Sequence, residues 1–254
     1  MTFKDWWTNE NNPSLPQSEY LYGTRHIVTL VLTVLLCVVL TIIFIKKSPK
    51  AKQILFYVLG GIFLFFEITS RVVNLIIADT YTLESVMKII LPMHICSVMV
   101  WVLIVAIFTK NKVLTNFGVI GGILATIAFL LYPAVGLNRT YMSFTCIYST
   151  FTHMLGFVSC VLLLTLGFAK FEFKKIYLPF ICFAIMFTWG ALLNFVIFPG
   201  SDYMYMVNDP LGLNLGGFPY QILYAVMIAV YITMFYLVSF IKDKIKQRKN
   251  RTAQ

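Results

Sequence analysis

The residues of this sequence best suited to chemistry are three histidines and a cysteine that lie in or beside long apolar stretches. They are His26, His94, Cys96 and His153. Ionisable side chains inside a bilayer are costly, and they usually face a protein interior and mark a functional site. A cysteine and a histidine from different helices can form a nucleophile–base pair, in which the histidine takes the thiol proton and later returns it to the leaving group. This chemistry requires the side chains to lie at the same depth in the membrane.

The apolar stretches that must position these residues are long enough to cross a membrane. Of the 254 residues, 59% are hydrophobic and 12% are charged. Apolar runs near 20 residues span the ~30 Å hydrocarbon core as helices, which satisfy their own backbone polar groups. The sequence therefore predicts an all-α polytopic bundle. Its seven transmembrane helices are expected at about 26–46, 54–78, 87–109, 113–135, 141–169, 176–198 and 217–241.

The net charge of +10 is explained by membrane topology, so no nucleic-acid partner is expected. Most lysines and arginines fall between spans 1 and 2, 3 and 4, and 5 and 6, or after span 7. Cytoplasmic loops carry such an excess of positive charge, which predicts that the N-terminus is outside and the C-terminus inside. The expected organisation is an outer interfacial segment at 1–25, a transmembrane domain at 26–241 and a basic cytoplasmic tail at 242–254.

Polar residues in span 2 share one helical face in the outer half of the membrane. Glu67, Arg71 and Asn74 are spaced at i, i+4 and i+7, which brings them to the same side of a helix. One interpretation is a Glu–Arg pair that fixes helix packing. The other is an arginine presented to a lipid phosphate or carboxylate, which suits its bidentate fork.

Spans 3 and 5 carry the candidate nucleophile and base. His94 and Cys96 are two residues apart, so in a continuous helix they point to different sides. His153 belongs to a stripe of polar and small residues in span 5 and lies at nearly the depth of Cys96, which makes it the better partner. The stripe has helical spacing and consists of Cys146, Ser149, Thr150, His153, Gly156 and Cys160.

These assignments place one polar layer in the outer half of the bundle. Asn194, Gln221 or Arg71 could hold a developing oxyanion there, which would suit acyl transfer to or from a lipid. The irregular loop 199–216 could cap the mouth of a cavity. The layer consists of Arg71, His94, Cys96, His153, Asn194 and Gln221.

Several other interpretations remain open on spacing alone. Cys96 could be an inert packing residue beside a histidine that is hydrogen-bonded within the bundle. A metal could bind His94, Cys96, Cys146 and His153, but no tight ligand spacing supports it, and no metal or other cofactor is predicted. Intramembrane Glu, Arg and His also line transport pathways, although no internal repeat is evident. A retinal receptor is disfavoured because span 7 has no lysine before Lys242.

The motifs themselves resemble those of a known family. LPMHICSVMVW at 91–101 resembles the LPLHLCxL signature of the family that contains bacterial YwaF-like proteins and animal transmembrane protein 164. YGTRHI at 22–27, YSTFTHMLGF at 148–157, DYMYMVNDP at 202–210 and GGFPY at 216–220 are similar to further motifs of this family, in the same order. The resemblance covers nearly the whole chain.

The resemblance implies a function as well as a fold. Animal members of the family are regarded as lipid acyltransferases that work through an acyl-cysteine. By resemblance, Cys96 would accept the acyl group and His153 would be its general base, while His94 and His26 also fall on motif positions. Asp202 stands where the family often has Asn, and Phe218 where it often has Trp. We expect an integral protein of a bacterial cytoplasmic membrane, with membrane lipids as its substrates.

Overall fold

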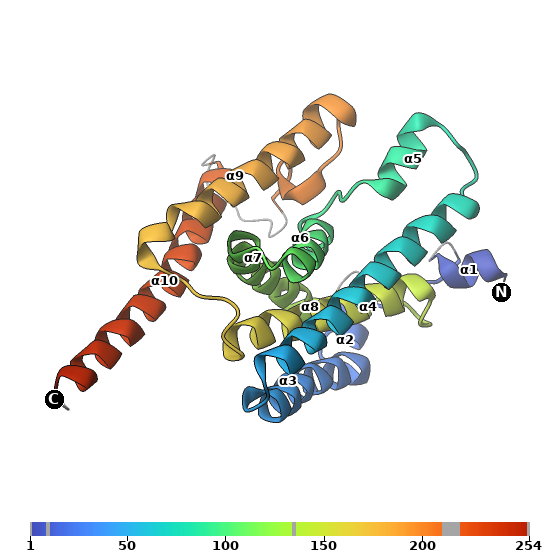
Figure 1. Ribbon diagram of the computed structural model, residues 1–254. Helices are drawn as coiled ribbons and strands as arrows, with labels where there is room; N and C mark the ends of the chain where they lie inside the picture. The colour runs from blue at the N-terminus through green and yellow to red at the C-terminus, as the bar shows by residue number, and fades with distance from the viewer. Residues whose placement is uncertain (1, 9–10, 134–135, 210–218, 253–254) are drawn as a thin grey trace. The chain divides into compact units, whose positions relative to one another are not determined.

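The computed structural model describes residues 2–8, 11–133, 136–209 and 219–252, and these form helices joined by turns and loops (Figure 1). Among these residues there is no β-strand, apart from an isolated bridge between Ser14 and Arg139. The prediction of an all-α fold is confirmed. The α-helices are α1 (Phe3–Trp7), α2 (Gln17–Tyr20), α3 (Thr24–Ile45), α4 (Pro49–Ile76), α5 (Leu83–Ile90), α6 (Ile95–Thr109), α7 (Lys112–Leu131), α8 (Phe144–Thr165), α9 (Tyr177–Leu192) and α10 (Tyr220–Thr252). The shorter turns are η1 (Phe173–Lys175), η2 (Leu193–Ile197) and η3 (Tyr203–Tyr205).

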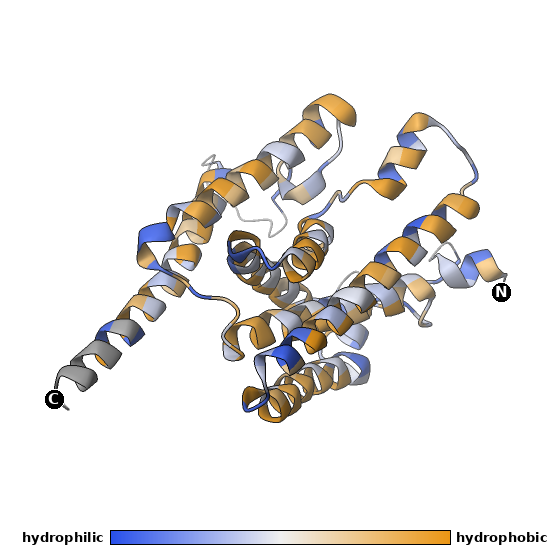
Figure 2. Ribbon diagram, viewed as in Figure 1, coloured by the Kyte–Doolittle hydropathy of each residue, from blue (hydrophilic) through white to orange (hydrophobic). Residues whose placement is uncertain are grey.

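Six segments of the described chain are long and apolar enough to cross a membrane, and a seventh crossing is possible if a bent pair counts as one span. The bent pair is α5 and α6, which meet at an angle of 59° across a short break. Pro92 lies in this break and cannot donate a backbone hydrogen bond. The predicted third span is therefore two helices instead of one, while the other spans agree with the hydropathy pattern shown in Figure 2.

The chain folds into two compact units. The first comprises the described residues of Met1–Leu91 and Met99–Phe168, and the second those of Pro92–Val98 and Ala169–Gln254. Pro92–Val98, which holds most of the LPMHIC motif, thus belongs to the second unit, whereas α5 and the part of α6 from Met99 onward belong to the first. The predicted boundaries at residues 25 and 242 concern the membrane and remain predictions; the chain beyond 242 continues α10 as far as Thr252.

Helix α8 is the centre of the first unit, where it packs against α7, α3 and α4. Small residues allow α7 and α8 to approach closely. A Cβ atom built on Gly122 of α7 would lie 2.6 Å from Sγ of Cys160, and one built on Gly156 of α8 would lie 2.9 Å from Thr126. The polar, small-residue stripe of span 5 is thus largely a helix-packing face.

The N-terminal segment docks on one end of the first unit. Trp7 stacks on Phe144 at a ring-centroid distance of 3.6 Å, and its Nε1–H donates to Asn74 at 2.9 Å. Lys4 forms an ion pair of 2.7 Å with Asp79. Trp7 is buried in protein, although tryptophans in such segments often lie at the lipid interface. Further hydrogen bonds join Asn12, Pro13, Ser14 and Leu15 to residues 138–141.

The second unit is built from α9 and α10. Helix α9 continues through one π-helical turn, η2, and the following loop contacts α9 again at η3. Aromatic contacts between Phe171 and Tyr236, at 5.3 Å, and between Phe173 and Phe240, at 5.4 Å, secure η1 and its approach against α10. The part of the predicted 199–216 loop that follows Asp209 lies outside the described residues.

Candidate functional site

The candidate nucleophile Cys96 lies in the first turn of α6, directly after the break in the bent span. His94 precedes the helix, so the helical rule that would point His94 and Cys96 to different sides does not apply to this pair. Within the second unit the break is held from α9, because the indole N–H of Trp189 donates to the carbonyl of Pro92 at 3.0 Å. His94 meets the ring of Tyr203 edge-on at 5.5 Å.

The loop that carries Tyr203 is fixed by Asn194. The Asn194 side chain is 1% exposed and exchanges two hydrogen bonds with Tyr203, donating to its carbonyl at 2.9 Å and accepting from its N–H at 2.7 Å. Both ends of the amide are therefore engaged by backbone. Asn194 acts in this structure as an anchor for the loop and does not present its amide as an oxyanion donor.

Two consecutive left-handed residues shape the same loop. Met204 and Tyr205 have φ values of 61° and 54°, which are uncommon for residues other than glycine. Met204 is buried, with its sulfur 2.9 Å from the Cβ position of Gly190. From α10, Tyr220 donates to the carbonyl of Tyr205, and the predicted site residue Gln221 donates to that of Met206, each at 3.1 Å. Strained backbone held in this way is common at functional sites.

Electrostatics connect this loop to the LPMHIC segment. Burial raises the pKa of the Tyr205 phenol, and negative charge on Cys96 and Asp202 would raise it further, so these groups lie within electrostatic range. Burial also tends to raise the pKa of Asp202, but hydrogen bonds from the backbone of Val207 and from Asn208 outweigh it and hold the pKa below its usual range. The second unit thus gathers His94, Cys96, Tyr203 and Tyr205 around one loop.

The polar face of span 2 forms a buried cluster in the first unit. Glu67 is completely buried and forms an ion pair with Arg71, and it also accepts a hydrogen bond from Tyr148 of α8. The predicted i, i+4 relationship of Glu67 and Arg71 is confirmed. Arg71 further donates through Nε to the carbonyl of Ile90 at 3.0 Å and lies 5.2 Å from the ring centre of Trp101.

His153 is held in one orientation on α8. Its Nδ1 lies 2.6 Å from the carbonyl oxygen of Ser149, so the proton is assigned to Nδ1 and the lone pair to Nε2. The ring stacks on Phe129 at 4.1 Å. An imidazole fixed by a backbone carbonyl at Nδ1 has the arrangement that a general base requires at Nε2. His153 belongs to the first unit and Cys96 to the second, so their pairing remains a prediction.

His26 has a structural position. It is fully buried, its Nε2 lies 2.7 Å from the carbonyl of Leu130, and its Nδ1 accepts from the N–H of Tyr22 at 2.9 Å. Both ring nitrogens are therefore occupied. This histidine joins the start of α3 to the end of α7.

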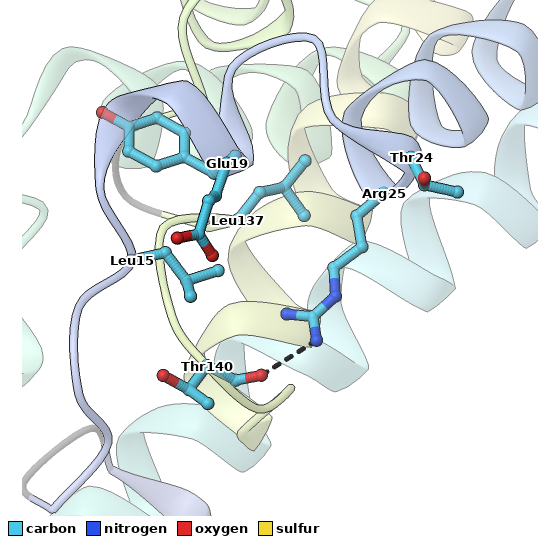
Figure 3. Close-up of a pocket in the computed structure, with 7 residues that line it drawn as sticks. Leu15, Glu19, Thr24, Arg25, Leu137 and Thr140 are labelled. Atoms are coloured by element: carbon cyan, nitrogen blue, oxygen red, sulfur yellow. Dashed lines mark hydrogen bonds between the residues drawn. The ribbon is translucent and has the colours of Figure 1, made fainter.

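A pocket of about 260 Å³ lies at the start of α3 (Figure 3). It is lined by Leu15, Glu19, Tyr20, Thr24, Arg25, Leu137 and Thr140, none of which was predicted as a site residue. The Arg25 guanidinium donates to the carbonyls of Arg139 and Thr140 at 2.8 and 2.9 Å. No group of three or more His, Cys, Asp or Glu in the described part of the chain is arranged to hold a metal.

Comparison with known proteins decides the family. The family described as TMEM164 matches residues 21–239. The chain belongs to the TMEM164 family. No curated protein matches the chain, and no solved structure does. This TMEM164-family chain is an integral membrane protein, as the apolar helices also indicate.

Three aromatic residues of this TMEM164-family protein make contacts that the sequence patterns do not predict. Trp101 and Tyr148 of the first unit and Tyr203 of the second lie inside the motifs described above, but as aromatic residues in apolar sequence they resemble packing residues. A signal was available for Tyr148, because a phenol buried in a membrane span needs a hydrogen-bond partner and Glu67 is the acceptor at that level.

Proposed function

We propose that this TMEM164-family protein is a lipid acyltransferase embedded in the membrane, with Cys96 as the acyl-accepting nucleophile. The observation that carries the proposal is the place of Cys96 in the first turn of α6, at the bend of a broken membrane span. His94, two residues before this thiol, contacts Tyr203 in a loop that Asn194 fixes. Hydrophobic helices on either side would bring acyl chains of membrane lipids to it.

The proposed reaction has two balanced steps. The Cys96 thiol gives its proton to His153, and the thiolate attacks the ester carbonyl of a donor lipid. The ester C–O bond breaks, and the leaving oxygen takes the proton from His153, which leaves a thioester on Cys96. A hydroxyl of an acceptor lipid, deprotonated by His153, then attacks the thioester. The C–S bond breaks, and His153 returns the proton to the released Cys96 thiolate. The distribution of lysines and arginines among the loops sets the predicted orientation, in which both steps occur in the outer leaflet.

The remaining predicted residues have supporting roles in this proposal. Asn194 and Gln221 hold the loop beside Cys96 through backbone carbonyls and amides. Glu67 and Arg71 contact each other, and His26 contacts backbone. Lipid headgroups would then be bound by other groups.

The proposal is tested with purified protein in nanodiscs that contain a phospholipid with an alkyne-tagged acyl chain. The tag should appear on Cys96 as a hydroxylamine-labile adduct and should move to an added lysophospholipid during a chase without tagged donor. Cys96→Ala should abolish both signals. Cys182→Ala is the matched control, since Cys182 is also half-buried and lies in the same unit. A folded Cys96→Ala variant that still transfers the tag would refute the proposal, and an adduct that never leaves Cys96 would show modification without catalysis.

Two other functions make different predictions in the same assay. A lipid hydrolase using the same cysteine and histidine would release tagged free fatty acid and form no new acylated lipid. A transporter or receptor would bind its ligand without Cys96 and would depend on Glu67, Arg71 and Asn194. Glu67 and Arg71 pair with each other, and the amide of Asn194 is engaged by the backbone of Tyr203. These contacts favour the acyltransferase over a transporter or receptor that uses the three side chains to bind a ligand.

A further inference from the structure

The broken span poses a physical problem that the surrounding protein must solve. Helix α5 ends at Ile90 and α6 begins at Ile95, so the last carbonyls of α5 lose their helical partners. In a membrane an unsatisfied backbone carbonyl is costly. Because the helix is interrupted, its backbone hydrogen bonds do not fix the 59° angle between α5 and α6.

One side chain contacts both arms of this break. Arg71 of α4 donates through Nε to the carbonyl of Ile90, the last residue of α5, at 3.0 Å. The same guanidinium lies over the indole of Trp101 on α6, 5.2 Å from the ring centre. Along the chain, Ile90 precedes the segment that contains Cys96 and Trp101 follows it.

The guanidinium itself is held by a buried acid. Glu67, one helical turn earlier on α4, pairs with Arg71 and is completely buried. Its second carboxylate oxygen accepts a hydrogen bond from the hydroxyl of Tyr148 on α8. The cluster thus joins α4 and α8 to both arms of the broken span, within the first unit.

We infer that Arg71 is a positioning residue, whose guanidinium fixes the angle between α5 and α6 and thereby the place at which Cys96 is presented. The inference rests on the proposed function only in taking Cys96 as the nucleophile. Arginine is required because its planar fork can donate to a carbonyl, pair with a carboxylate and stack on an indole at once, whereas the ammonium of lysine is a compact point charge on a flexible stem.

The first experiment measures the bend directly. Spin-labelled amino acids are placed at the exposed positions Leu83 and Phe108, and their distance distribution is recorded in the full-length protein in nanodiscs. Arg71→Lys, which keeps the charge beside Glu67, should broaden or shift the distribution. Lys88→Gln should leave it unchanged, because this matched control removes only an exposed i, i+4 ion pair on α5.

The second experiment measures where Cys96 is presented, through its rate of alkylation by N-ethylmaleimide as followed by peptide mass spectrometry. Arg71→Lys should change this rate at least about fivefold, while the rate at Cys182 stays the same. A purely structural weakening would instead lower the melting temperature and change both thiols together. Trp101→Leu keeps the buried ion pair and should act in the same direction, so it covers the case in which Arg71→Lys does not fold.

The inference fails if folded Arg71→Lys or Trp101→Leu protein retains the wild-type distance distribution and Cys96 alkylation rate. Neither readout needs acyl chemistry. A shifted bend in a protein whose Cys96 never carries an acyl group would overturn the proposed function and leave this inference standing. If the variants transfer acyl groups normally and their bend and Cys96 alkylation rate are unchanged, the proposed function stands and this inference fails.

Discussion

Nε2 of His26 lies 2.7 Å from the carbonyl oxygen of Leu130, across 104 residues of sequence. This contact, with the N–H of Tyr22 at Nδ1, uses both ring nitrogens of a fully buried histidine. His26→Ala should therefore reduce the free energy of unfolding by about 1–3 kcal/mol, because the buried carbonyl of Leu130 and the part-buried N–H of Tyr22 lose their partner. Thermal unfolding in detergent measures the loss. Acyl-adduct formation per folded molecule should stay at the wild-type level, and its loss in a protein of normal stability would assign His26 to the chemistry.

Close packing of α7 against α8 gives a prediction with its own control. A methyl group at Gly122 would lie 2.6 Å from Cys160 Sγ, whereas one at Gly61 in α4 would have no heavy atom within 4 Å. Gly122→Ala should destabilise the protein by about 1–3 kcal/mol through overpacking. Gly61→Ala should be neutral or stabilising by up to about 1 kcal/mol, since alanine is the better helix former. Equal melting temperatures for the two variants would contradict the packing seen here.

Hydropathy and helical spacing predicted the spans and the Glu67–Arg71 pair because both depend on local sequence. They did not predict the break before Cys96. A proline near a helix end is tolerated in many spans, and here long-range contacts from Arg71 and Trp189 support the open backbone. The depth of His94 and Cys96 in the membrane stays a prediction, and the conformation between the two residues could not be predicted from sequence.

Tertiary partners explain the other differences. The sequence offers Asn194 as an oxyanion donor, yet its amide forms two hydrogen bonds with the backbone of Tyr203. These bonds depend on the conformation of the loop after η2. Trp7 packs on Phe144, a contact that the composition of the N-terminal segment does not predict. Depth in the membrane follows from sequence position, whereas the direction of a side chain around its helix depends on neighbours that only the fold supplies. The pairing of Cys96 with His153 stays a prediction for this reason.

The loop beside Cys96 should loosen in acid. Asp202 accepts from the N–H groups of Val207 and Asn208 at 2.8 and 3.1 Å, and its pKa in the folded protein is below the usual value. A lowered pKa means that the stabilisation is complete above the unfolded value, about 3.9, and is lost as the pH falls through the folded pKa. Between about pH 5 and pH 8 the Asp202 carboxylate keeps its charge, so its hydrogen bonds to the loop should not change.

Hydrogen-exchange protection of individual amides, corrected for intrinsic exchange rates, checks this expectation. At pH values below about 4, the protection of the Val207 and Asn208 amides should decrease. The Tyr203 amide is the internal control, because its acceptor is the non-titrating amide of Asn194. Asp202→Asn should remove the pH dependence. A fall that begins near pH 6 in the wild type would assign the transition to a histidine instead.

The orientation of His153 leads to the sharpest test of the proposed chemistry. With Nδ1–H directed to the carbonyl of Ser149, only Nε2 can take a proton from Cys96. His153→Gln retains a polar side chain of similar size but no group that titrates near neutrality. The rate of acyl-adduct formation should fall by about 10²–10⁴-fold, the usual contribution of a general base. Part of the rate should return at high pH, where hydroxide in place of His153 removes the proton of the Cys96 thiol.

The same substitution at His94 separates the two histidines. His94 contacts Tyr203 in the unit that contains Cys96, and on the proposed mechanism His94→Gln lowers the rate by less than about tenfold, because the base remains. Pre-steady-state labelling with the tagged donor, from pH 6 to 9, compares both variants with the wild type. If His94→Gln shows the large loss and the recovery at high pH, while His153→Gln does not, then His94 is the base. His153, half-buried and stacked on Phe129, would then serve helix packing.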